Sequence, residues 1–269
     1  YYCIAHGPVS STIKGLFLLV SIIYWCLFMI YFVPPIPQSQ SYHEFADQRS
    51  LHHLISASFM PNIPHALDVL SNIPFLIIGA YGLYLLLSHT TIVFFTSFEK
   101  LGWLIFFLSI CFVCIGSSYY HLRPSNGTLV WDRLPMTVGF SSLLGLLIDE
   151  RISPLLGKCL FPFLLIIGFV SCAYWYYKDD LRPYILVQFY PMIYIPILLL
   201  ISSNIYSHTS FYIYACILYS MAKVSEVADK PVFRLTLKTV SGHTLKHLFA
   251  SSAIAVILYM LNVRVILKA

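Results

Sequence analysis

Charged side chains are scarce in this sequence. Only 10% of its 269 residues are Asp, Glu, Lys or Arg, whereas 59% are hydrophobic. An ordinary soluble domain carries charge at roughly a quarter of its positions. The scarcity of charge therefore excludes a water-soluble fold, and the short polar joins between apolar stretches leave no room for a soluble second domain.

The sequence also lacks a basic cluster and a disulfide framework. Its net charge of +5 is spread over the predicted loops, which excludes nucleic acid as a partner. Each cysteine lies in or beside an apolar stretch, as is typical of free thiols in packed helices. The spacing of Cys111 and Cys114 resembles half of a metal site, but no second pair exists, and we assign both to packing. The full set of cysteines is Cys3, Cys26, Cys111, Cys114, Cys159, Cys172 and Cys216.

Long apolar stretches dominate what is present. An α-helix needs ~20 mostly apolar residues to cross ~30 Å of hydrocarbon. We therefore predict an all-α, polytopic transmembrane helical bundle in an integral, multi-pass membrane protein. The first stretch is too long for a signal-peptide core and is predicted to be retained; because the chain begins at Tyr1 instead of Met, we expect its start to be incomplete. Eight stretches qualify as spans, at residues 13–33, 65–87, 101–120, 131–148, 155–177, 183–202, 209–225 and 241–262.

Histidines at the start of the last stretch are the first candidate site. His243 and His247 are four residues apart, so they share one helical face and can reach one metal ion. Ionisable groups within a membrane span are costly and are by default functional candidates. By itself the pair is equally compatible with histidines that bond to neighbouring helices.

A second group of polar residues surrounds the join between the third and fourth stretches. Ser117 and His121 are again four residues apart, and Asp132 follows after a predicted loop that contains Arg123, Pro124, Asn126 and Gly127. In an antiparallel bundle, the ends of odd helices and the starts of even helices lie on the same side. His121, Asp132 and His243 should therefore meet at one membrane depth.

Three histidines with an open fourth position are the ligand set of a catalytic zinc, whereas a structural zinc has four protein ligands. We predict that His121, His243 and His247 bind Zn²⁺, that Asp132 acts as general base, and that Ser117 donates a hydrogen bond to the attacking water or to the developing oxyanion. The alternatives are a first-turn carboxylate that stabilises its helix for Asp132, and a small packing residue for Ser117.

These residues form three short motifs in a fixed order: Ser-x-x-x-His at 117–121, Asp-x-Leu-Pro-Met at 132–136 and His-x-x-x-His at 243–247. The pattern resembles the alkaline ceramidases, seven-helix zinc amidases of the CREST superfamily, over residues 65–261. The Ser71-Asn72 pair is similar to the end of the family's first-helix motif. The resemblance implies a seven-helix core at residues 65–269 after an extra helix and polar loop at residues 1–64. It implies hydrolysis of a ceramide-like membrane lipid, with the same three histidines, aspartate and serine at the active site.

The chain departs from the family in two places. Arg133 replaces a glutamate, so we expect a different preference for the lipid head group. His65 replaces the glutamate of a regulatory calcium site. The oxygen ligands left nearby are fewer than the six to eight or so that calcium uses, and calcium is therefore doubtful. These remaining candidates are Glu44, Asp47, Asn62 and Asp68.

Charged residues near the proposed site leave two interpretations open. Lys223, Glu226 and Asp229 have helical spacing, so they could orient a ligand histidine, although an interfacial charge network is the favoured interpretation. Lys246 could extend to the lipid head groups or pair with an acidic residue.

Three other functions fit parts of the pattern. A related hydrolase that cuts an ester in a glycerolipid or a glycosylphosphatidylinositol lipid would have the same zinc site. A receptor of the progestin and adiponectin type would also have it, but the chain has no sizeable soluble tail for partners. A transporter with a histidine proton relay needs polar residues across the bilayer, yet the stretches at 155–177 and 183–202 are almost uniformly apolar apart from Gln188.

Overall fold

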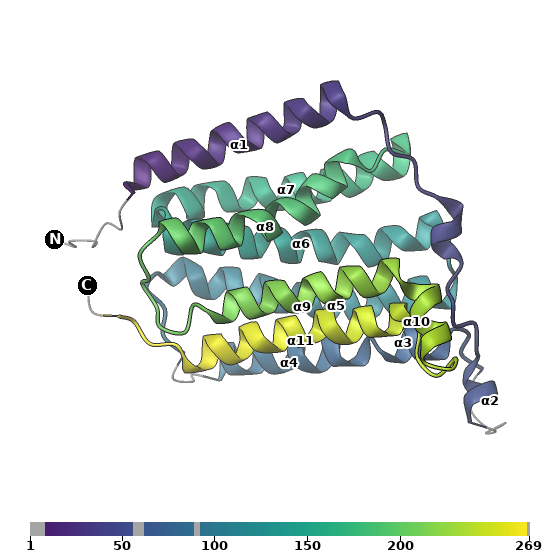
Figure 1. The fold of residues 1–269 in the computed structure, drawn as a ribbon. Coiled ribbons are helices and arrows are strands. Elements are labelled where there is room, and N and C mark those ends of the chain that lie inside the picture. Colours follow the sequence, from purple (N-terminus) through teal and green to yellow (C-terminus); the bar gives the residue numbers. More distant parts are fainter. Residues whose placement is uncertain (1–8, 56–61, 89–91, 268–269) are drawn as a thin grey trace.

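The protein is a bundle of long helices (Figure 1). The computed structural model describes residues 9–55, 62–88 and 92–267, and no β-strand occurs among them. The prediction of an all-α fold is thus confirmed. In chain order the elements are α1 (Ser11–Phe32), η1 (Gln40–His43), α2 (Leu51–Leu54), α3 (Ala66–Leu70), α4 (Ile73–Leu87), α5 (Ser97–Leu122), α6 (Asn126–Arg151), α7 (Pro154–Lys178), α8 (Arg182–Ile201), α9 (Phe211–Val227), α10 (Asp229–Leu235) and α11 (Gly242–Val263).

Six helical segments in the described part of the chain are long and apolar enough to cross a membrane: α1, the continuous α3–α4 segment Ala66–Leu87, α5, α7, α8 and α11. The chain is thus a multi-pass membrane protein by the length and composition of its helices. Helices also occupy the other two predicted spans. However, α9 has only 17 residues, fewer than the ~20 that a span needs, and α6 carries charged residues near both of its ends.

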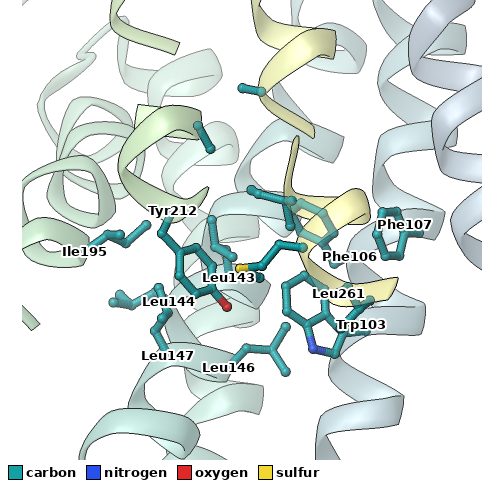
Figure 2. Close-up of a cluster of buried hydrophobic side chains, with 14 of the residues drawn as sticks. Trp103, Phe106, Phe107, Leu143, Leu144, Leu146, Leu147, Ile195, Tyr212 and Leu261 are labelled. Carbon is teal, nitrogen blue, oxygen red and sulfur yellow. The ribbon is translucent and has the colours of Figure 1, made fainter. Parts of the chain in front are cut away.

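The core lies between α5, α6 and α11. Helix α5 packs against α4 and α6, α6 packs against α7, and α9 packs against α11. Figure 2 shows the aromatic rings of α5 near the leucines of α6, with Ile195 of α8, Tyr212 of α9 and Leu261 of α11 labelled beside them. Because α6 is enclosed by protein on most of its surface, it tolerates polar residues that a lipid-facing helix would not. The labelled core residues are Trp103, Phe106, Phe107, Leu143, Leu144, Leu146, Leu147, Ile195, Tyr212 and Leu261.

The first helix lies along the side of the bundle (Figure 1). Helix α1 is mostly apolar, and only Lys14 and Leu18 of it are buried, as expected for a helix that faces lipid. Several polar contacts hold it, among them hydrogen bonds from Arg182 and Tyr190 of α8 to its backbone carbonyls. The Lys14 ammonium donates to the carbonyl of Arg151 at 2.9 Å, and the Ser21 and Tyr190 hydroxyls are 3.1 Å apart.

Two predicted joins differ from the structure. Residues 149–154 were expected to form a polar join, but α6 continues to Arg151. Its last charged residues are buried because they pair within the bundle: Arg151 contacts Glu150 at 2.8 Å, and Arg264 lies 3.9 Å from the same Glu150 carboxylate. The predicted loop before Asp132 is also shorter, since α6 already begins at Asn126, where Ser125 caps it.

The six cysteines in the described part of the chain are free, as predicted, and Cys3 lies outside that part.

Candidate metal centre

Three histidines meet at the end of the bundle where α5 ends and α11 begins. His121 lies in the last turn of α5, and His243 and His247 lie in the first turns of α11. Each is almost completely buried, with 0%, 4% and 3% of its surface exposed. One potential ligand atom from each lies within 4.8 Å of the other two. The three histidines therefore meet as the sequence predicts. We call them the histidine triad.

The ring nitrogens of the triad fit a metal ion. Both nitrogens of His121 and Nε2 of His247 are buried and have no hydrogen-bond partner. Unpartnered buried polar atoms are rare and costly in proteins. A divalent cation bound by one nitrogen of each ring would remove much of that cost, and the all-imidazole donor set suits a metal of intermediate softness.

Ser71 orients one of the three rings. Its Oγ donates to the carbonyl of Asp68 at 3.1 Å and lies 2.8 Å from Nδ1 of His247. Since a hydroxyl has a single proton, Ser71 uses that proton on Asp68 and accepts a hydrogen bond from His247. Nδ1 of His247 then carries the ring proton, and Nε2 presents its lone pair to the other two histidines.

We expect Ser71→Ala to weaken metal binding by about 10- to 100-fold, because the partner that fixes the tautomer and angle of His247 is lost. Titration of the purified protein with Zn²⁺ against a competing chelator measures this. Ser252→Ala on the outer face of α11 is the matched control, since that exposed hydroxyl contacts only the backbone of its own helix. Equal affinities for the two variants would contradict the role of Ser71.

The start of α11 is fixed by its neighbours. Asp229 accepts a hydrogen bond from the backbone N–H of His243 at 2.8 Å through Oδ1. Gly242 allows this close approach, because a Cβ at that position would lie 2.2 Å from the carbonyl oxygen of Ser225. Asp229 thus positions His243 through the backbone, as a helix-terminal carboxylate can.

Ser117 and Asp132 lie beside each other where α5 touches α6. The Ser117 hydroxyl lies near the Asp132 carboxylate, both side chains line the same cavity, and both are buried. Gly116 makes this contact possible, since a Cβ there would lie 1.9 Å from the carbonyl oxygen of Trp131. A glycine therefore brings the two backbones together next to the two predicted catalytic side chains.

Gly116→Ala should destabilise the protein by about 1–3 kcal/mol, because the added methyl group forces α5 and α6 apart. Gly127→Ala is the control, since its nearest neighbour would lie 3.9 Å from the new Cβ. Thermal unfolding of both variants in the same detergent tests the prediction. A melting temperature for Gly116→Ala equal to that of Gly127→Ala would show that the helices are not held by this contact.

An apolar cavity extends from the site into the bundle. His247, Ser117 and Asp132 line it together with many apolar side chains. Along α5 its lining runs from Ser117 to Phe106, a rise of about 16 Å at about 1.5 Å per residue. The cavity has the length and character to hold a hydrocarbon chain next to the triad.

The chain between α1 and α2 covers the triad from the loop side. Figure 1 shows it running along the end of the bundle that carries α3 and α10. The ring of Phe45 lies over His121 and His243, with centroid separations of 4.6 and 4.9 Å. The backbone N–H of Ala46 donates to Asp229 at 2.8 Å. We call residues 38–49 the covering segment. The boundary predicted between residues 64 and 65 would separate this segment from the histidine triad that it covers.

Two further side chains fasten the covering segment. His43 bonds through its two ring nitrogens to Tyr120 and Asn126, both at 2.9 Å. The Tyr42 hydroxyl donates to Glu226 at 2.9 Å. Burial raises the pKa of Tyr42 to about 12, and the neighbouring Glu226 carboxylate adds to the shift, so this phenol stays protonated and remains a donor.

Charged residues near the triad form ion pairs. Glu226 pairs with Lys246 at 2.7 Å and also contacts Lys223. Arg133 lies in an aromatic cage instead, with its guanidinium 4.2 Å from the Trp175 ring centroid and 4.7 Å from that of Tyr184. Lys246 therefore pairs with an acidic residue, which is the second of the two interpretations left open by the sequence.

The carboxylates considered as calcium ligands are bonded to side-chain donors. Asp47 pairs with Arg49 at 2.7 Å, and the exposed Glu44 lies 3.5 Å from Lys230. Asp68 accepts hydrogen bonds from the Ser241 and Thr244 hydroxyls. Among the carboxylate oxygens of Glu44, Asp47 and Asp68, only Oδ2 of Asp68 is buried and has no hydrogen-bond partner.

Sequence reasoning did not find the roles of Ser71, Phe45 and Tyr42 at this site. A serine near a membrane-helix start and two aromatic residues in a loop have no spacing that marks them. No protein-family model, curated protein or solved structure matches this chain.

Proposed function

We propose that this protein is a zinc-dependent membrane hydrolase that cleaves the amide bond of a ceramide-like lipid to a sphingoid base and a fatty acid. The observation that carries the proposal is the histidine triad at the polar end of an apolar, chain-sized cavity, with Asp132 lining the same cavity. Metal ligands, a carboxylate and a hydrocarbon site are the parts that lipid hydrolysis needs.

Zinc is the metal that the donor set favours. Three imidazoles with no fourth protein ligand are typical of catalytic zinc. Zinc bound there would polarise a lipid carbonyl and lower the pKa of water from ~16 towards ~7.

Asp132 is placed to move the proton. A carboxylate within hydrogen-bond reach of the attacking water takes its proton and passes it to the leaving amine nitrogen. The hydroxyl of Ser117 lies near this carboxylate and lines the same cavity. When substrate is bound, the same hydroxyl is positioned to donate to the developing oxyanion.

The bundle supplies the surroundings of the reaction. The lipid chain occupies the apolar cavity between α5, α6, α8, α9 and α11, and water reaches the triad from the loop end. We assign catalysis to the seven-helix part of the chain, residues 65–269, with α1 as an additional helix. The covering segment closes the site against bulk water.

An amide is favoured over an ester by the resemblance of Leu134-Pro135-Met136 and Ser71-Asn72 to the ceramidase motifs. The test is to incubate purified protein with ceramides of several chain lengths, quantify the released fatty acid, and measure zinc in the same sample. Fatty acid release by zinc-containing protein is the expected result. Cleavage of a glycerolipid or glycosylphosphatidylinositol ester with ceramide left intact would reassign the substrate, and zinc without hydrolysis of any lipid would refute the enzyme.

A further inference from the structure

The apolar cavity has the same depth along three helices. Its lining extends over residues 106–117 of α5, 132–143 of α6 and 246–257 of α11. In each helix the two ends of the lining are eleven residues apart, which is about 16 Å at about 1.5 Å per residue. Since α5 ends where α6 and α11 begin, residues 117, 132 and 246 lie together beside the triad. The opposite ends of the three stretches therefore mark a common level deep in the bundle.

Buried side chains close the cavity at this deep level. Phe106, Leu143 and Ile257 line it there, and each has at most 8% of its surface exposed. One turn further along α5 and α6, Trp103 and Leu147 are almost completely buried in the apolar core and do not line the cavity (Figure 2). The core of the bundle thus ends the cavity. We call Phe106, Leu143 and Ile257 the cavity floor.

The cavity changes in character from one end to the other. Ser117, Asp132 and His247 line it beside the triad, whereas Ala253 and the cavity floor are apolar. The hydrocarbon chain attached to a reacting carbonyl begins at the metal, so an acyl chain would run from the triad towards the floor. Such a chain advances about 1.25 Å per carbon when extended, so about 16 Å accommodates about 13 carbons. A longer chain must displace closely packed side chains, which is as costly as overpacking a core.

We propose that the cavity floor limits the acyl chain that this protein accepts to about 14 carbons, the carbonyl carbon included. The inference rests on the proposed function for the identity of the lipid, and it adds a chain-length class: amide lipids whose acyl chain is no longer than a myristoyl group. The limit itself is a property of binding and does not require hydrolysis.

Binding of saturated fatty acids tests the limit without catalysis. Fatty acids from decanoate to eicosanoate compete with radiolabelled myristate for the purified protein, at equal mole fractions in detergent micelles and with and without zinc. We expect similar competition up to myristate and a loss of at least about tenfold by stearate, as overpacking predicts. Equal competition by myristate, stearate and eicosanoate would show that the chain leaves the cavity sideways, and would overturn the proposal.

Two substitutions on α11 should move the limit in opposite directions. Ile257→Ala removes most of one side chain of the cavity floor and should admit a chain about two carbons longer. Ala253→Leu places a branched side chain about 6 Å nearer the triad, and should shorten the limit by about four carbons. Loss of stability would weaken the binding of all chains alike, so it cannot produce opposite shifts.

Ala255→Leu is the matched control for Ala253→Leu. It is the same substitution on the same helix, but Ala255 does not line the cavity. Its limit should equal that of the unmodified protein. A limit that stays unchanged in both Ile257→Ala and Ala253→Leu would refute the role of the cavity floor.

Hydrolysis separates this inference from the proposed function. With the sphingoid base held constant, the N-myristoyl lipid should be cleaved at least about tenfold faster than the N-stearoyl lipid. A rate that depends on the length of the base and not on that of the acyl chain would refute the limit. Cleavage of all acyl chains at one rate would keep the proposed function and overturn the limit. A protein that cleaves no lipid but shows the length limit in binding would refute the proposed function and leave this inference standing.

Discussion

His121→Ala should remove both the bound metal and the activity. Two histidines on one helix remain in this variant, and a site reduced from three protein ligands to two holds zinc poorly. We expect the zinc content to fall from about one ion per chain to near zero, and the hydrolysis rate to fall at least about a thousandfold, since metal-ion catalysis supplies several kcal/mol. Elemental analysis and fatty acid release on the same preparation measure the two quantities.

The fold of His121→Ala should survive, because neither nitrogen of this ring has a protein partner to lose. Circular dichroism and size-exclusion chromatography in detergent check this point. His53→Ala is the matched control, since His53 is exposed in α2 and should keep its zinc and its rate. Full zinc occupancy in His121→Ala would show that the ion is bound elsewhere.

Asp132→Asn should separate catalysis from metal binding. The amide has the shape of the carboxylate and can still accept the Ser117 hydroxyl, but it cannot take a proton from water. Loss of a general acid and base commonly costs about a hundred- to ten-thousandfold in rate. We therefore expect normal zinc content, normal melting temperature and a rate reduced by that factor.

Glu44→Gln provides the comparison for Asp132→Asn. Glu44 is also a carboxylate near the loop end of the site, but it is 65% exposed and pairs only with Lys230. Its replacement should leave the rate unchanged. If Asp132→Asn retained the activity of Glu44→Gln, Asp132 would be a helix-terminal carboxylate and another group would move the proton.

The helices were predictable because a membrane span is a local property of about twenty consecutive residues. The ends of α6 were not. Asp149 and Arg151 change the local composition from apolar to polar, which suggested a join. They are buried in a helix because residues far away in the chain bond to them: Thr96 donates to the Asp149 carboxylate, and Asn204 accepts a hydrogen bond from the Arg151 guanidinium. Such pairing between distant segments is invisible to a local window.

The same contrast holds at the metal centre. His243 and His247 were found from their spacing on one helix, and alternation of antiparallel helices added His121. The covering segment was missed, since Phe45 belongs to a loop without periodicity and meets the triad only through the fold. The tautomer of His247 also could not be predicted, because it depends on which acceptor takes the single proton of Ser71.

The position of Phe45 affects how the metal enters and leaves. Its ring lies against two of the three ligands, and the hydrogen bonds of Tyr42, His43 and Ala46 hold the segment in place. An ion arriving from water on this side must wait until those bonds break together. The exchange half-life is then set by the frequency of that opening, and a chelator added in excess strips the ion no faster than the loop lifts. A metal ion held by the triad would therefore exchange slowly.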